Sequence, residues 1–240
     1  AVQERIELLI HRVHFHDLQQ DFMEWSNAKH PELLRGAILV ARYQFPELNV
    51  PAILAQFDQI RRNIWLELNN YLTSLEQVNV FNSILYNYYK LHGHELTERE
   101  PKYFFINQVL ESKQGNGYTI GVLYLALAEI LDIPVFAVDV PRQFIFAYID
   151  TLYSFLTPEK GLNQVQFYLD PINGLVYTQK DVDTYLRKIN AHDREEYSKP
   201  LDAKRIIFKM MEELSLCYRY RREEQKAEEI QQLMRLLVDA

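Results

Sequence analysis

Apolar residues in the first hundred positions recur at the three- and four-residue spacing of amphipathic helices. Three such stripes are Ile6, Leu9, Ile10 and Val13; Leu33, Leu34, Ala37, Ile38 and Ala41; and Ile53, Leu54, Phe57 and Ile60. Prolines at 31, 46 and 51 suit helix starts or the turns just before them. The segment VFNSILYNYYKLH adds a further predicted helix. This half of the chain is therefore expected to be helical.

The pattern changes after Pro101. KYFFINQVLES predicts a short helix and KQGNG a turn, because glycines adopt backbone angles that other residues resist. YTIGVLYLALAEIL has no polar residue in its second half before Glu129, which indicates a helix buried on nearly all sides. Four predicted strands follow, with apolar residues on both faces: IPVFAVDV, QFIFAYID, VQFYLD and GLVYT. They predict a small sheet that is covered on both sides.

Helices return with TQKDVDTYLRKI and, after a polar loop around NAHDREEYSKP, over residues 202–219 and 222–238. The last of these carries one apolar stripe, formed by Ala227, Ile230, Leu233, Met234 and Leu237. A helical hairpin that caps the core is expected. The predicted fold is α+β and predominantly helical, with a helical region at 1–98, a sheet-bearing core at 99–190 and a helical tail at 191–240, packed as one unit.

Composition excludes several classes of function. The chain has 240 residues and a net charge of -7, so no basic field attracts nucleic acid. Glu129, Asp132 and Pro134 interrupt the most apolar run, so no membrane span is expected. Cys217 is the only cysteine, which excludes an intramolecular disulfide and favours a reducing compartment. No secretory signal is evident at the start, and a cytoplasmic location is expected.

Two long stretches resemble the transglutaminase-like proteins of the bacterial SirB type. They are EPKYFFINQVLESKQGNGYTIGVLYLALAEILDIPVFAVDVPRQFIFAYID and YLDPINGLVYT. LLRGAILVARYQFPELNVPAILAQFDQI is similar to the N-terminal half of that family. The resemblance extends over about 33–189 and is looser over 202–238. It implies a helical half, a small papain-like core and tetratricopeptide-like helices at the end.

Active members of the wider group use a cysteine at the tip of the buried helix, a histidine on the next strand and an aspartate on a further strand. The resemblance places these three positions on Gly117, on Gln143 of PRQF and on Asp170 of LDP. Glycine offers no nucleophile and glutamine exchanges no proton near neutral pH. The resemblance therefore implies the fold and argues against the activity.

We expect a catalytically inactive protein that binds a protein or peptide, with no cofactor. Its binding surface would be the vacated cleft or the helical parts, and the expected cleft residues are Asn116, Tyr118, Thr119, Arg142 and Tyr103. The alternative is a hydrolase or acyltransferase with a rearranged site that uses Thr119 or Tyr118 with Asp170. A structural turn is the competing interpretation of Asp170, because LDPxxG aspartates accept backbone N–H groups. A purely structural subunit is a third possibility.

Two histidine pairs and the many tyrosines were candidates for further sites. His14 and His16 cannot readily share a metal on a helix, and His92 and His94 lie in HGHELTERE. Solvent-exposed histidines are expected for both pairs, and no metal site. The tyrosines of LYNYYKLH and KYFF are too many for one small core, so some are expected to line a groove or an interface.

Overall fold

The computed structural model describes residues 2–149, 165–191, 197 and 199–238. The N-terminal part is helical, as predicted: α1 Val2–Asn27, α2 Leu33–Gln44, α3 Val50–Glu67 and α4 Ser74–Asn82. α4 continues without a break into a π-helical segment, Ser83–Tyr88. A capping box at Thr73 and a proline in the first turn of α3 mark two of the helix starts.

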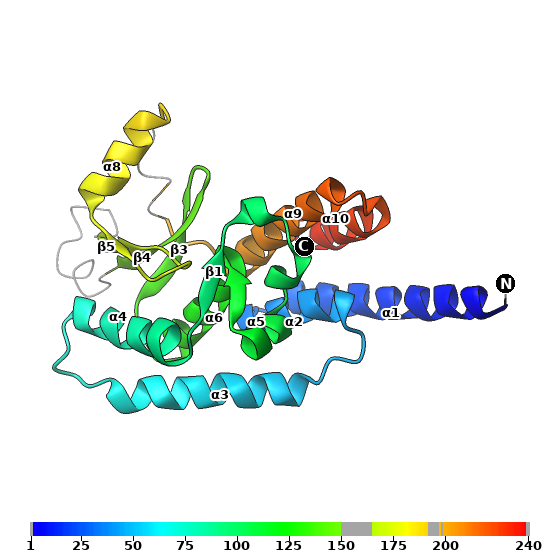
Figure 1. Ribbon diagram of the computed structural model, residues 1–240, viewed down its shortest axis with the longest axis horizontal. Coiled ribbons are helices and arrows are strands. Elements are labelled where there is room, and N and C mark those ends of the chain that lie inside the picture. Colours follow the sequence, from blue (N-terminus) through cyan, green and yellow to red (C-terminus); the bar gives the residue numbers. More distant parts are fainter. Residues whose placement is uncertain (1, 150–164, 192–196, 198, 239–240) are drawn as a thin grey trace.

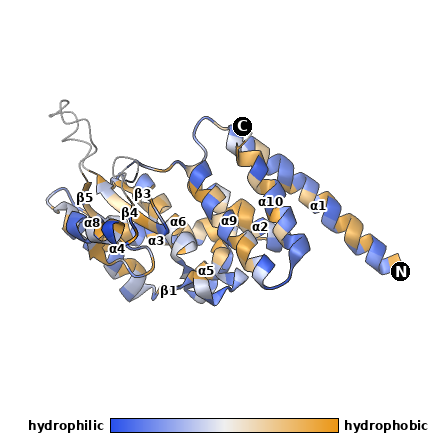
Figure 2. Cartoon of the chain, turned by 90° about the horizontal axis from the view of Figure 1, so that it is seen from above, coloured by the Kyte–Doolittle hydropathy of each residue, from blue (hydrophilic) through white to orange (hydrophobic). Residues whose placement is uncertain are grey.

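α1 contacts the rest of the protein only from His11 onward. Its buried residues are Leu18, Phe22, Trp25 and Ser26, whereas every residue from Val2 to Ile10 is exposed. Figure 1 and Figure 2 show the N-terminal half extending away from the other helices. The periodicity therefore predicted the helix correctly, but its first apolar stripe does not contribute to the core.

A two-stranded parallel ladder precedes the buried helix. β1 His92–His94 pairs with β2 Gln114–Asn116. The prediction of a turn at KQGNG is wrong, because the three central residues of this segment form β2. Two 3-10 helices, Leu96–Glu98 and Pro101–Phe104, and α5 Ile106–Ser112 connect the strands. Both glycines of KQGNG lie outside the left-handed region, which Lys113 adopts instead. Gly115 is needed for close approach, since a Cβ there would lie 2.8 Å from Val109.

The centre of the fold is α6 Gly117–Ile130, packed on a four-stranded antiparallel sheet (Figure 1). The strands are β3 Val135–Val140, β4 Gln143–Ile149, β5 Val165–Leu169 and β6 Val176–Tyr177, ordered as they occur in the chain. Every residue of α6 from Gly117 to Ala128 is buried. The predictions of an all-round buried helix and of four strands are confirmed.

Apolar side chains alternate in direction along the strands, so both faces of the sheet are buried. Phe146 and Tyr148 of β4 join the main core with α6, whereas Ile145, Ala147 and Ile149 join a second cluster on the opposite face. α8 Gln179–Lys188 closes that second cluster with Val182 and Leu186. The expected two-sided burial is confirmed.

The chain ends in a helical hairpin of α9 Ala203–Tyr220 and α10 Glu224–Val238. The predicted stripe of α10 is buried, and the main core runs from Leu18 of α1 to Leu237 of α10. The polar loop expected around 190–200 falls mostly outside the described residues. No helix in the described part of the chain is long and apolar enough to cross a bilayer.

Candidate functional site

The N-terminus of α6 is the position at which the resemblance expects a nucleophile. Asn116 caps the helix, and its Oδ1 accepts hydrogen bonds from the backbone nitrogens of Tyr118 at 3.0 Å and Thr119 at 3.1 Å. Gly117 is the first residue of the helix. The helix dipole would favour a thiolate at this tip, but the glycine at position 117 has no side chain.

The tip is closed by the turn that follows β5. Gly117 and Asn116 are buried, and a Cβ at position 117 would lie 3.4 Å from Ile172 and 3.7 Å from Pro171. Thr119 is fully buried and Tyr118 is 9% exposed. Of the residues expected to line a cleft, Asn116, Tyr118 and Thr119 are therefore buried, whereas Tyr103 is half-buried and Arg142 is exposed.

Thr119 lacks the partners of a nucleophile. Its hydroxyl donates to the backbone oxygen of Tyr103 at 2.6 Å and lies 3.3 Å from Asn116 Oδ1. Both are acceptors that hold the proton in place without removing it. Burial raises the pKa of Tyr118, whose ring stacks on Phe144 at 4.4 Å, so its hydroxyl stays protonated.

The position at which the resemblance expects a histidine is Gln143, which precedes Phe144 of the Tyr118–Phe144 ring pair. Gln143 is exposed at the first residue of β4, directly after Arg142, which is exposed and has a left-handed backbone with φ of 61°. Phe144 contacts Tyr118 and so connects this hairpin to the tip of α6. The structure thus brings the β3–β4 hairpin next to the tip, but Gln143 carries no titratable group to it.

Asp170 organises the turn between β5 and β6. Its Oδ1 accepts the backbone N–H of Ile172 at 2.8 Å, and its backbone oxygen accepts that of Gly174 at 2.7 Å. Gly174 has φ of +73°, which favours glycine, and a Cβ there would lie 2.5 Å from the Asn82 side chain. The Tyr177 hydroxyl donates to Asp170 Oδ2 at 3.5 Å, and burial together with this carboxylate raises the pKa of Tyr177. The structural interpretation of Asp170 is therefore the one that its contacts fit.

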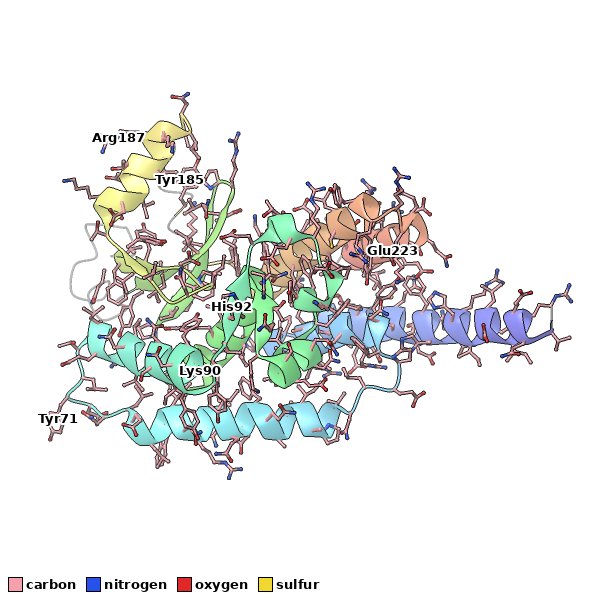
Figure 3. All side chains as sticks on the ribbon, viewed as in Figure 1. Tyr71, Lys90, His92, Tyr185, Arg187 and Glu223 are labelled. Atoms are coloured by element: carbon pink, nitrogen blue, oxygen red, sulfur yellow. The ribbon has the colours of Figure 1, made fainter. Side chains whose placement is uncertain are left out.

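His94 lies beside the tip of α6, a placement that the sequence analysis did not predict. In the β1–β2 ladder His94 lies opposite Asn116, and its ring stacks on that of Tyr103 with 4.1 Å between the ring centroids. Its Nδ1 meets Glu98 at 2.8 Å and its Nε2 meets Gln114 at 2.5 Å, so both ring nitrogens are occupied. The side chain is 16% exposed, which corrects the expectation of a solvent-exposed histidine; His92 is exposed, as expected (Figure 3).

The sequence analysis also misjudged the exposure of His14 and did not consider Glu213. His14 is half-buried, with its Nε2 2.8 Å from the backbone oxygen of Arg42, whereas His16 is exposed as expected. Burial, followed by the neighbouring Glu212, raises the pKa of Glu213 on α9. Periodicity alone gave no signal for the contact of His14 with Arg42 or for the burial of Glu213. Among the described residues, no three His, Cys, Asp or Glu side chains are grouped to hold a metal ion.

Cys217 lies on α9, apart from α6 and the sheet in the sequence. It is buried on α9, and burial raises its pKa to about 11. We expect alkylation by iodoacetamide at pH 7.5 to be roughly 10- to 100-fold slower in the native protein than in denaturant, because thiolate is the reactive form. Mass spectrometry of labelled protein gives the rate without ambiguity, as the chain has one cysteine. Equal rates in the two states would contradict the burial.

An open groove lies elsewhere, between α3 and the helix formed by α4 and the π-helical segment. Its volume is about 660 Å³, and it is lined by Asn63, Leu66, Glu67, Glu76, Asn79, Val80, Ser83, Ile84 and Tyr88. Tyr88 is 71% exposed, as expected for some of these tyrosines, and Tyr71 points away from the body at the turn between the two helices (Figure 3). Hydrogen bonds from Thr73 lower the pKa of Glu76, so the groove keeps a negative edge.

The core of the fold is a buried helix, α6, packed on a four-stranded antiparallel sheet. Residues 51–212, well over half of the chain, match the transglutaminase-like superfamily. The chain therefore belongs to that superfamily, which confirms this part of the resemblance. Searches of curated proteins and of solved structures gave no match.

Proposed function

We propose that this chain is a catalytically inactive transglutaminase-like protein that acts by binding a protein or peptide. The observation that carries the proposal is Gly117 at the first position of α6, where the chemistry of the superfamily needs a thiol. Gln143 at the base position, the occupied hydroxyl of Thr119 and the structural contacts of Asp170 support it. The Thr119 hydroxyl meets only the Tyr103 carbonyl and the Asn116 amide oxygen, and the hydroxyl that meets the Asp170 carboxylate is that of Tyr177 on β6.

The groove between α3 and α4 is the binding surface that we assign to this function. Its lining includes the buried Ile84, the half-buried Val80 and the exposed Leu66, together with the carboxylates of Glu67 and Glu76. Such a surface suits a peptide that places apolar anchors in the groove and Lys or Arg beside them.

The finer assignments are proposals as well. The quoted stretches favour the SirB-type branch and a bacterial origin, and the α9–α10 hairpin corresponds to the tetratricopeptide-like tail of that branch. The lone reduced cysteine favours the cytoplasm.

Incubation with glutamine-containing peptides and a primary amine tests the catalytic part. We expect no ammonia release and no amide transfer above the uncatalysed rate, because neither the attack nor the base step has a carrier. Thr119→Val and Asp170→Asn serve as matched variants. Turnover by the wild-type chain that either substitution abolishes would replace the proposal with the rearranged-enzyme alternative.

A further inference from the structure

The N-terminal half of α1 has a narrow apolar stripe that meets nothing in the described chain. Val2, Ile6, Leu9 and Val13 are 74%, 51%, 58% and 61% exposed. Their spacing alternates four, three and four residues, which is the a/d pattern of a coiled coil. Figure 2 shows this part of the helix projecting from the body, with apolar (orange) positions between polar (blue) ones along it.

The opposite face of α1 is the one that packs on the protein. In the same heptad, Leu18 occupies an f position and Phe15 and Phe22 occupy c positions, and all three contact the core. His11, at another f position, meets Glu229 of α10 at 2.9 Å. The stripe therefore points away from the body.

Charges beside the stripe indicate what would pack on it. Arg5 and Arg12 fall on successive g positions, one heptad apart, and both are exposed. The e positions are Gln3, Ile10 and Asp17, so the flank is basic on one side and nearly neutral on the other. In coiled coils the e and g residues select the partner by opposite charge.

A second copy of the chain fits these charges less well. An antiparallel pair would set the g flanks together and so place arginine against arginine. A parallel pair would match Arg12 with Asp17 but would leave Arg5 beside Ile10. A partner helix that places a carboxylate opposite each of Arg5 and Arg12 would form an ion pair with both arginines.

We propose that the exposed half of α1 is a docking helix for an amphipathic helix of another protein, with acidic residues beside its apolar stripe. A helical segment of this length that packs on nothing is marginal in water, and a partner helix would cover the apolar stripe and satisfy both arginines. This inference rests on the proposed function in assigning a protein partner. A chain that bound such a helix yet turned over acyl substrates would keep this inference and lose the function proposed above.

The test uses fluorescent synthetic helices of about three heptads, with Leu and Val at a and d and either Glu or Lys at every e and g. Anisotropy with the full chain is expected to give a dissociation constant on the order of micromolar for the Glu peptide, and at least about tenfold weaker binding for the Lys peptide. In the Arg5→Glu/Arg12→Glu variant the preference is expected to reverse. Ile6→Gln/Leu9→Gln should abolish binding.

Leu8→Gln is the matched control, since Leu8 is 46% exposed on the same helix but lies off the stripe. It is expected to bind as the wild type does, and circular dichroism checks that all variants fold. Absence of binding, equal binding of the two peptides, or binding lost in Leu8→Gln would overturn the proposal. So would sedimentation showing a dimer that Ile6→Gln dissociates, or partition of the stripe into anionic vesicles.

Discussion

Replacement of Phe146 by alanine is expected to lower the free energy of unfolding by about 3–5 kcal/mol, the largest effect that we foresee for a single side chain. Phe146 is fully buried at the centre of β4. Its ring lies 5.6 Å from the rings of Tyr124 and Phe144, and its edge fills the space that a side chain at Gly121 would need. The alanine variant loses this packing and leaves a cavity between α6 and the sheet.

Urea unfolding followed by circular dichroism measures the change, with the midpoint shifting and the slope staying nearly constant. Tyr71→Ala is the control, because Tyr71 is 95% exposed and its loss should change stability by less than about 0.5 kcal/mol. A loss below about 1 kcal/mol for Phe146→Ala would contradict the placement of α6 on this sheet.

Gly93→Ala is expected to be the second most damaging change, at about 1–3 kcal/mol. A Cβ at Gly93 would lie 2.7 Å from the backbone oxygen of Ile172 and 2.8 Å from its Cα. Backbone cannot rotate away as a side chain can, so β1 and the Asp170 turn would have to separate. The expected result is a lower unfolding midpoint.

Gly117→Ala is the matched control at the same site. Its Cβ would meet Ile172 at 3.4 Å, an ordinary contact, and Gly117 does not use the left-handed backbone. Alanine there is expected to be neutral or to stabilise by up to about 1 kcal/mol through the unfolded state. Equal losses for the two alanine variants would mean that Ile172 does not lie between β1 and α6.

The secondary structure was largely predictable because its signals are local. The run from Tyr118 to Ala128 has no charged side chain, and burial on all sides followed from that. The turn residues of LDPxxG likewise predicted the backbone contacts of Asp170. In both cases one segment of sequence contains the whole physical cause.

The misjudged features depend on contacts between distant segments. His94 faces Asn116 only because two three-residue strands pair in parallel, and strands this short leave no periodic pattern. The closed tip of α6 depends on Ile172, which lies 55 residues from Gly117 in the sequence. The stripe of α1 has a helical period whether or not anything covers it, so periodicity could not tell core from exposed surface.

The absence of an activated nucleophile at the tip of α6 is the claim on which the functional account rests. It is tested most directly with a glutamine peptide whose amide is replaced by a reactive electrophile, followed by peptide mapping of the protein by mass spectrometry. We predict no modification of residues 116–121, because Gly117 has no reactive atom and the Thr119 hydroxyl is bonded to the Tyr103 carbonyl. A stoichiometric adduct on Thr119 or Tyr118 that disappears in Asp170→Asn would contradict this account.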